Sequence, residues 1–181
     1  MTTVLAGGDS FIWGSELSDS PHGGLDGYSK NTFPALLADN YVCVAYPGIG
    51  NTEISNRVKE ACRHAKFDLV IVSWTWPSRD DNLTSDREIN ELAAYLKYHD
   101  QPYMFTCADN CVVTESIDLT NWFMFPPAEE EWLTTTPRGF YQWATENKYP
   151  IGPDRHPLEQ AHIDAANLMQ EKFNEMVKKS V

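Results

Sequence analysis

Leu69–Trp74 reads LVIVSW, an almost unbroken run of apolar residues. A strand that is covered on both faces, as in a parallel sheet, has this continuous pattern rather than an alternating one. Similar short runs occur at Thr3–Ala6, Tyr41–Tyr46 and Tyr103–Cys107. We therefore expect these four segments to be strands of one buried parallel sheet.

The segments between these runs have helical periodicity. Apolar residues recur at helical spacing from Ile54 to Ala65 and from Ile89 to Leu96, and a longer stripe follows Pro157. Strands that alternate with helices predict a parallel sheet joined by right-handed crossovers and covered on both faces. The expected fold class is α/β: a three-layer α/β/α sandwich around a flavodoxin-like parallel sheet of about five strands.

Length and charge limit the possible functions. The 181 residues predict a single domain, 1–181. With 14 basic and 26 acidic residues the net charge is −12, so phosphate backbones and anionic membranes would be repelled. We therefore expect neither a nucleic-acid partner nor a membrane partner, and the oligomeric state stays open.

We looked for targeting segments, disulfides and metal-binding motifs in the sequence. We expect no transmembrane helix, because no long apolar window exists, and no signal peptide, because the N-terminus lacks a basic region. The expected location is cytoplasmic or virion-associated. The four cysteines predict reduced thiols, and no metal site is expected.

An aromatic-rich excursion at about 109–150 interrupts the alternation of strands and helices. Long irregular segments in compact domains are usually functional or disordered, and this one is too aromatic for disorder. One interpretation is a packed segment that covers a sheet edge. The other is a lid or substrate wall, with Trp143, Phe140 and Tyr149 as the candidates to line the pocket. The two interpretations are compatible.

Three polar clusters follow predicted strands or precede the last helix: Gly7–Phe11, Pro47–Thr52 and Asp154–Pro157. Ligands of open parallel sheets bind outside the carboxyl ends of the strands. The clusters contain a serine, a histidine and an aspartate, which is the set that acyl transfer needs: the histidine takes the serine proton and the aspartate orients the imidazole. We therefore predict a catalytic triad of Ser10, His156 and Asp154.

These clusters resemble conserved blocks of the SGNH (GDSL-type) hydrolases. Gly8-Asp9-Ser10 is similar to the first block, Gly48–Thr52 to the second and Asp154–Pro157 to the last. The resemblance spans nearly the whole chain. It implies an α/β/α fold, esterase chemistry without cofactor or metal, and an oxyanion hole in which Ser10 and Gly50 contribute N–H groups, with Gly48 as the second choice to Gly50.

Two departures from that pattern stand out. The third block of the family, Gly-x-Asn-Asp, is replaced by Ser73–Arg79, which contains no asparagine. Thr75 or Ser78 could donate a hydroxyl hydrogen bond to the oxyanion instead, whereas loss of one donor costs about 10²–10³ in rate. In addition, Asp154 stands two residues before His156, where the family commonly has three.

The remaining site predictions concern the substrate. We assign substrate contacts to five residues: Asn51, Trp74, Trp76, Arg79 and Trp143. Two of these residues could instead have purely structural roles: Asn51 could cap a helix, and Arg79 could form a surface ion pair with Asp80 or Asp81. The predicted function is a serine esterase or deacylase acting on an acylated small molecule or glycan. The alternative is a catalytically impaired binding or structural module, for example of a phage virion.

Overall fold

The computed structural model describes residues 1–22, 25, 27–80, 84–128 and 136–178. Within these ranges four strands form one sheet in the order β2-β1-β3-β4. All three pairings are parallel. The strands are β1 (Thr3–Gly7), β2 (Asn40–Cys43), β3 (Leu69–Trp74) and β4 (Tyr103–Cys107). The strands predicted at 69–74 and 103–107 are confirmed. The sequence predicted a sheet of about five strands, whereas the described residues form four.

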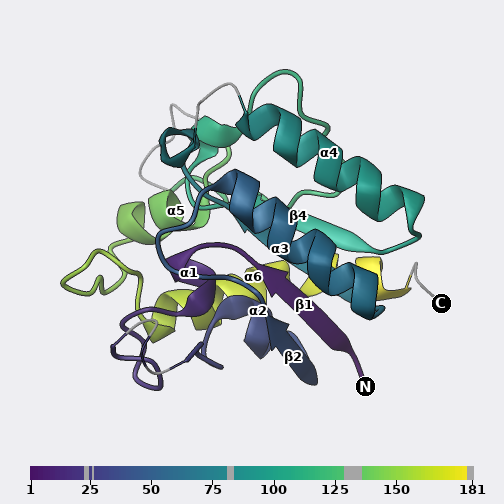
Figure 1. Ribbon diagram of the computed structural model, residues 1–181. Coiled ribbons are helices and arrows are strands. Elements are labelled where there is room, and N and C mark those ends of the chain that lie inside the picture. Colours follow the sequence, from purple (N-terminus) through teal and green to yellow (C-terminus); the bar gives the residue numbers. More distant parts are fainter. Residues whose placement is uncertain (23–24, 26, 81–83, 129–135, 179–181) are drawn as a thin grey trace.

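Helices cover both faces of the sheet, which confirms the three-layer α/β/α architecture (Figure 1). The helices are α1 (Ser10–Trp13), α2 (Phe33–Leu36), α3 (Asn51–His64), α4 (Ser85–Tyr98), α5 (Phe140–Glu146) and α6 (Glu159–Lys178), with short 3-10 turns η2 (Pro77–Arg79) and η3 (Asn110–Val112). Helices α3 and α4 lie on one face, and α2 and α6 lie on the other.

The alternation of side chains along β1 explains the two covered faces. Val4 and Ala6 belong to the core cluster beneath α2 and α6, whereas Leu5 belongs to the cluster beneath α3 and α4. Successive side chains of a strand point to opposite faces, so an apolar run buries both of them. The central position of β1 also places the end of this strand in the middle of the sheet edge.

The aromatic excursion covers the outer edge of β4. Phe105 forms a parallel bridge with Trp122: its N–H donates to Asn121 O at 2.8 Å and its carbonyl accepts from Phe123 N at 2.7 Å. Phe125 and Phe140 are fully buried in the core. The sheet-edge interpretation is therefore confirmed for the described part, while residues 129–135 lie outside it.

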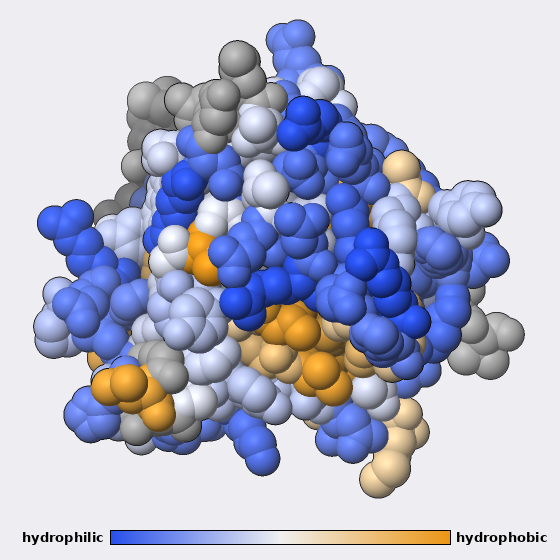
Figure 2. All heavy atoms as spheres, in the orientation of Figure 1, coloured by the Kyte–Doolittle hydropathy of each residue, from blue (hydrophilic) through white to orange (hydrophobic). Residues whose placement is uncertain are grey.

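The visible surface is mainly hydrophilic. Figure 2 shows polar and charged side chains over α3 and α4, and an apolar patch near β2, where Val42 is exposed. None of the helices in the described ranges combines the length and the apolar character that a bilayer crossing needs.

Candidate active site

Ser10 lies at the end of the central strand, where the chain turns into α1. The turn passes through Gly8, at which a Cβ atom would collide with the side chain of Ile12. Asp9 caps α1, because its Oδ1 accepts the Phe11 N–H at 3.0 Å. Ser10 is the first residue of the helix, and its own N–H therefore has no helical partner. This is the geometry that an oxyanion donor needs.

The Thr75 side chain hydrogen-bonds to Asp9 and does not line the cavity at Ser10. Its hydroxyl donates to Asp9 Oδ2 at 2.7 Å, and its N–H donates to Asn51 Oδ1 at 2.9 Å. Both of its donors are thus committed within the protein. The prediction that Thr75 replaces the missing oxyanion donor is therefore wrong in this structure. Ser78, the second candidate, is exposed on η2 and does not line the cavity at Ser10.

Asn51 joins two of the loops at the sheet edge. Its amide N–H donates to Thr75 O and to Ser85 Oγ, each at 3.0 Å, and its side chain is fully buried. The prediction of a substrate contact for Asn51 is therefore wrong, because every polar atom of the amide is used inside the protein. Nor does the side chain cap α3, since Gly50 occupies that position.

Arg79 packs against the same network. Its Nη1 lies 3.4 Å from Asp9 Oδ2, and its guanidinium lies 5.5 Å from the centre of the Trp76 ring. Arg79 thus pairs with the buried Asp9, and not with Asp80 in the surface pair considered above. Asp81 lies outside the described residues.

His156 is paired with Glu16, a residue that the sequence did not single out. His156 Nδ1 lies 2.7 Å from Glu16 Oε2, and both side chains are largely buried. Glu16 also accepts the backbone N–H of Asp154 at 3.0 Å and that of His156 at 3.3 Å. A substitution at Gly152 would push a Cβ atom into the Glu16 carboxylate. The loop before α6 therefore closes around this carboxylate.

The charge state of Glu16 fixes the tautomer of His156. Burial raises the pKa of Glu16, but the hydrogen bonds from Asp154 and His156 outweigh burial and hold this pKa below its ordinary value. The carboxylate is ionised at neutral pH and can only accept, so His156 Nδ1 carries the proton and Nε2 carries the lone pair. The prediction that Asp154 orients His156 is wrong: only its backbone N–H joins the group.

Ser10 and His156 face one cavity of about 570 Å³. Its lining comprises Ser10, Ser15, Glu16, Pro21, His22, Leu25, Pro47, Gly48, Asp154 and His156. Ser10 and His156 make no direct hydrogen bond, although Phe11, the neighbour of Ser10, packs edge-on against the imidazole with 5.4 Å between ring centres. Catalytic hydrogen bonds often tighten only when substrate is bound.

Gly48 lines this cavity, whereas Gly50 does not. Gly48 has a φ of 82°, in the left-handed region that favours glycine, and lies in the loop after β2. Gly50 caps α3 and packs directly against the Asp80 carboxylate. Of the two glycines considered for the oxyanion hole, Gly48 and not Gly50 therefore borders the space at Ser10.

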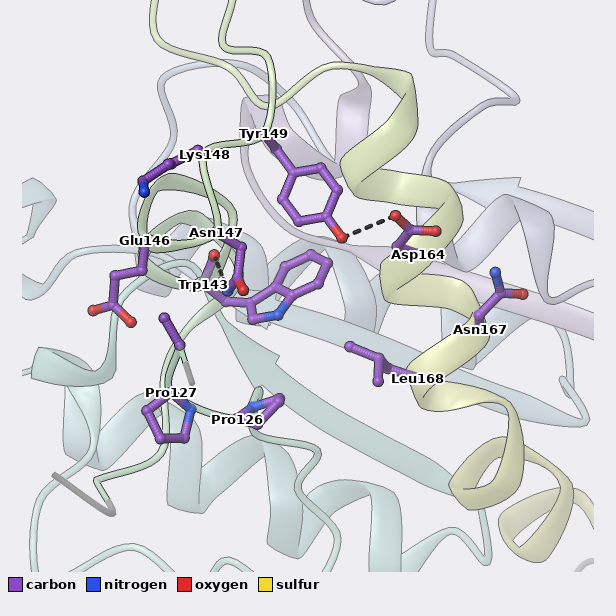
Figure 3. A pocket seen from close by; sticks show the side chains of 11 residues that line it. Pro126, Pro127, Trp143, Glu146, Asn147, Lys148, Tyr149, Asp164, Asn167 and Leu168 are labelled. Carbon is purple, nitrogen blue, oxygen red and sulfur yellow. Dashed lines mark hydrogen bonds between the residues drawn. The ribbon is translucent and has the colours of Figure 1, made fainter. Parts of the chain in front are cut away.

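The predicted aromatic substrate contacts lie elsewhere. Trp74 is fully buried against Phe105, and Trp76 packs on Phe11 and Tyr141. Trp143 and Tyr149 line a separate hollow of about 730 Å³, shown in Figure 3, which shares no lining residue with the Ser10 cavity. The substrate-wall interpretation of the excursion is thus wrong for Trp143, Phe140 and Tyr149.

The described residues contain no group of three or more His, Cys, Asp or Glu side chains placed to hold a metal ion. Cys107 is buried, and Cys111 is exposed on η3.

Comparison with solved structures identifies the fold. A protein from Desulfitobacterium hafniense described as lipolytic and of the G-D-S-L family superposes with a TM-score of 0.54 at 14% identity, covering 94% of this chain and 99% of the other. A psychrotrophic esterase from Pseudoalteromonas sp., inhibited by monoethylphosphonate, gives 0.55 at 13%, covering 99% and 98%. No family model and no curated protein sequence matches. The chain has the SGNH-hydrolase fold.

Proposed function

We propose that the chain is a serine esterase or deacylase of SGNH type in which Ser10, His156 and Glu16 form the triad. One observation carries this proposal: the Glu16 carboxylate binds His156 Nδ1 at 2.7 Å in the cavity that Ser10 lines. The fold of the two solved hydrolases supports it, and an acylated small molecule or glycan is the substrate class.

The first step is the attack of Ser10 on the ester carbonyl. His156 Nε2 removes the proton from the Ser10 hydroxyl while the Oγ–carbon bond forms, and Glu16 stabilises the resulting imidazolium. The N–H groups of Ser10 and Gly48 bind the oxyanion of the tetrahedral intermediate. The carbon–oxygen bond to the alcohol then breaks, and the imidazolium gives its proton to the departing oxygen.

The second step returns the enzyme to its starting state. Water enters the cavity and loses a proton to His156 Nε2 as it attacks the acyl-enzyme. The bond to Ser10 Oγ breaks, and the imidazolium returns the proton to Ser10. The acid product leaves, and no cofactor takes part.

Labelling with a fluorophosphonate tests the proposal directly. The native chain should gain one phosphonyl adduct, located on Ser10 by peptide mass spectrometry, and should hydrolyse small acetyl, aryl or thioester substrates. Ser10→Ala should gain no adduct. Ser15→Ala is the matched control, because Ser15 lines the same cavity and should leave labelling intact.

A catalytically impaired binding or structural module is the second candidate. The observation that favours it is the absence of the third-block asparagine, together with the commitment of the Thr75 hydroxyl to Asp9. Such a module would show no adduct on Ser10 and no hydrolysis of any of these substrates, and this result would contradict the esterase proposal.

A further inference from the structure

The carboxylate of Asp154 is left unused by the proposed triad. Its backbone N–H donates to Glu16, but its side chain is exposed and lines the cavity that contains Ser10. Within the described ranges this carboxylate has no ion-pair or hydrogen-bond partner, and the neighbouring Arg155 does not line the cavity. A negative charge without a partner therefore faces the space where substrate would bind.

The other charges around the cavity do not neutralise Asp154. The lining residues that the structure describes include no lysine and no arginine. Glu16 accepts hydrogen bonds from His156 Nδ1 and from two backbone N–H groups, and none of these donors carries a positive charge that could offset Asp154. The chain as a whole has a net charge of −12, which adds to a negative potential at the site. Cationic ligands are attracted to such a cavity and anionic ligands are repelled.

Asp154 lines the same cavity as Ser10 and His156. It stands two positions before His156, the residue that protonates the departing oxygen in the proposed reaction. The lining also includes Pro21, Leu25 and Pro47, which offer apolar surface. Apolar walls with a small number of polar or charged groups are the usual composition of a site that orients a small ligand.

We propose that Asp154 is a specificity-determining residue that selects esters whose alcohol part carries a positive charge, such as an amino or quaternary ammonium group. This inference rests on the proposed esterase function. Because the carboxylate is exposed and screened by solvent, the preference is modest: about threefold to tenfold in kcat/KM at low ionic strength.

A pair of substrates of equal shape tests the preference. Acetylcholine is compared with its neutral carbon isostere, the acetate ester in which a tert-butyl group replaces the trimethylammonium group. The native chain should favour the cationic ester by about threefold to tenfold, and added salt should reduce this ratio. Asp154→Asn should bring the ratio close to one and leave turnover of the neutral ester nearly unchanged. Glu171→Gln, an exposed position on α6, removes the same charge away from the cavity and should keep the ratio.

Each other outcome overturns a different statement. If Asp154→Asn leaves the cationic-to-neutral ratio of kcat/KM unchanged, or if Glu171→Gln lowers this ratio equally, Asp154 does not determine specificity. Either result leaves the esterase proposal intact. Loss of turnover of both esters in Asp154→Asn makes Asp154 part of the catalytic machinery, which also overturns the inference. No turnover and no phosphonyl adduct in the native chain contradicts the proposed function itself.

Discussion

Glu16 Oε2 lies 2.7 Å from His156 Nδ1, although 140 positions separate these residues in the chain. The segment that follows Ser10 thus supplies the carboxylate that holds the histidine. A second contact runs in the opposite direction, since the Ser18 N–H donates to Glu159 Oε1 at 2.6 Å. The two contacts join the loop after α1 to the start of α6, and they place His156 at the cavity of Ser10.

The first prediction is that Glu16→Gln loses about 10²–10⁴ in kcat, because an amide neither fixes the Nδ1–H tautomer nor stabilises the imidazolium. The neutral side chain fills nearly the same volume, so the fold should persist. Initial rates on an aryl acetate, together with circular dichroism, measure the two effects. Asp154→Asn is the matched control and should stay within about threefold of the native kcat on this neutral ester. The reverse order of the two variants would restore Asp154 as the orienting acid.

The second prediction concerns the shared action of Ser10 and His156. Ser10→Ala and His156→Ala should each remove most of the turnover, and the double variant should be little worse than either, because residues that act as one unit are not additive. Rates of all three variants on one substrate give the double-mutant cycle. Losses that multiply would show that the two side chains act independently.

The third prediction is that Thr75→Val destabilises the fold by about 1–3 kcal/mol, since the buried Asp9 carboxylate loses a hydrogen-bond donor. Thr75→Ser keeps the hydroxyl and should stay near the native stability. Urea unfolding of both variants measures this difference. If Thr75 were an oxyanion donor, Thr75→Val would instead lower kcat by about 10²–10³ at unchanged stability.

Much of the fold could be predicted from the sequence, because continuous apolar runs are specific for strands that are covered on both faces. Leu69–Trp74 and Tyr103–Cys107 match β3 and β4 in full. The run at Tyr41–Tyr46 is less informative, since β2 is an edge strand and its residues are half-buried or exposed. Residues near Trp122 contribute a single bridge and not a fifth strand, and a local pattern does not report such an edge contact.

The site was only partly predictable. Ser10 and His156 follow from their places at a strand end and before the last helix, but the partner of His156 depends on how two distant loops meet. The spacing of Asp154, two residues before His156, was the one signal in the sequence that another acid could be the partner of His156. Glu16 is the first acidic residue after Ser10 in the chain. Similarly, the aromatic residues at Trp143 and Tyr149 suggested a substrate wall, yet they pack beside α6 (Figure 3).

A second histidine, His162, lies inside the core on α6. Its Nδ1 accepts the Phe33 N–H at 3.2 Å, and its ring stacks on Phe33 with 5.8 Å between ring centres. Burial lowers the pKa of His162 to about 3, against an ordinary value of 6.5. The folded chain therefore keeps this imidazole neutral over a pH range in which the unfolded chain protonates it.

The last prediction follows from that difference. Between about pH 6.5 and pH 3 the unfolded state binds a proton on His162 that the folded state does not bind, so stability falls as the pH falls, by up to about 1.4 kcal/mol per pH unit. The free energy of unfolding in urea should show this slope between about pH 6.5 and pH 5, where carboxylates of ordinary pKa contribute little. His162→Gln keeps an acceptor for the Phe33 N–H and cannot be protonated, so its slope in this range should be flatter by about that amount. Equal slopes in the two proteins would show that His162 is protonated in the folded state as readily as in the unfolded state.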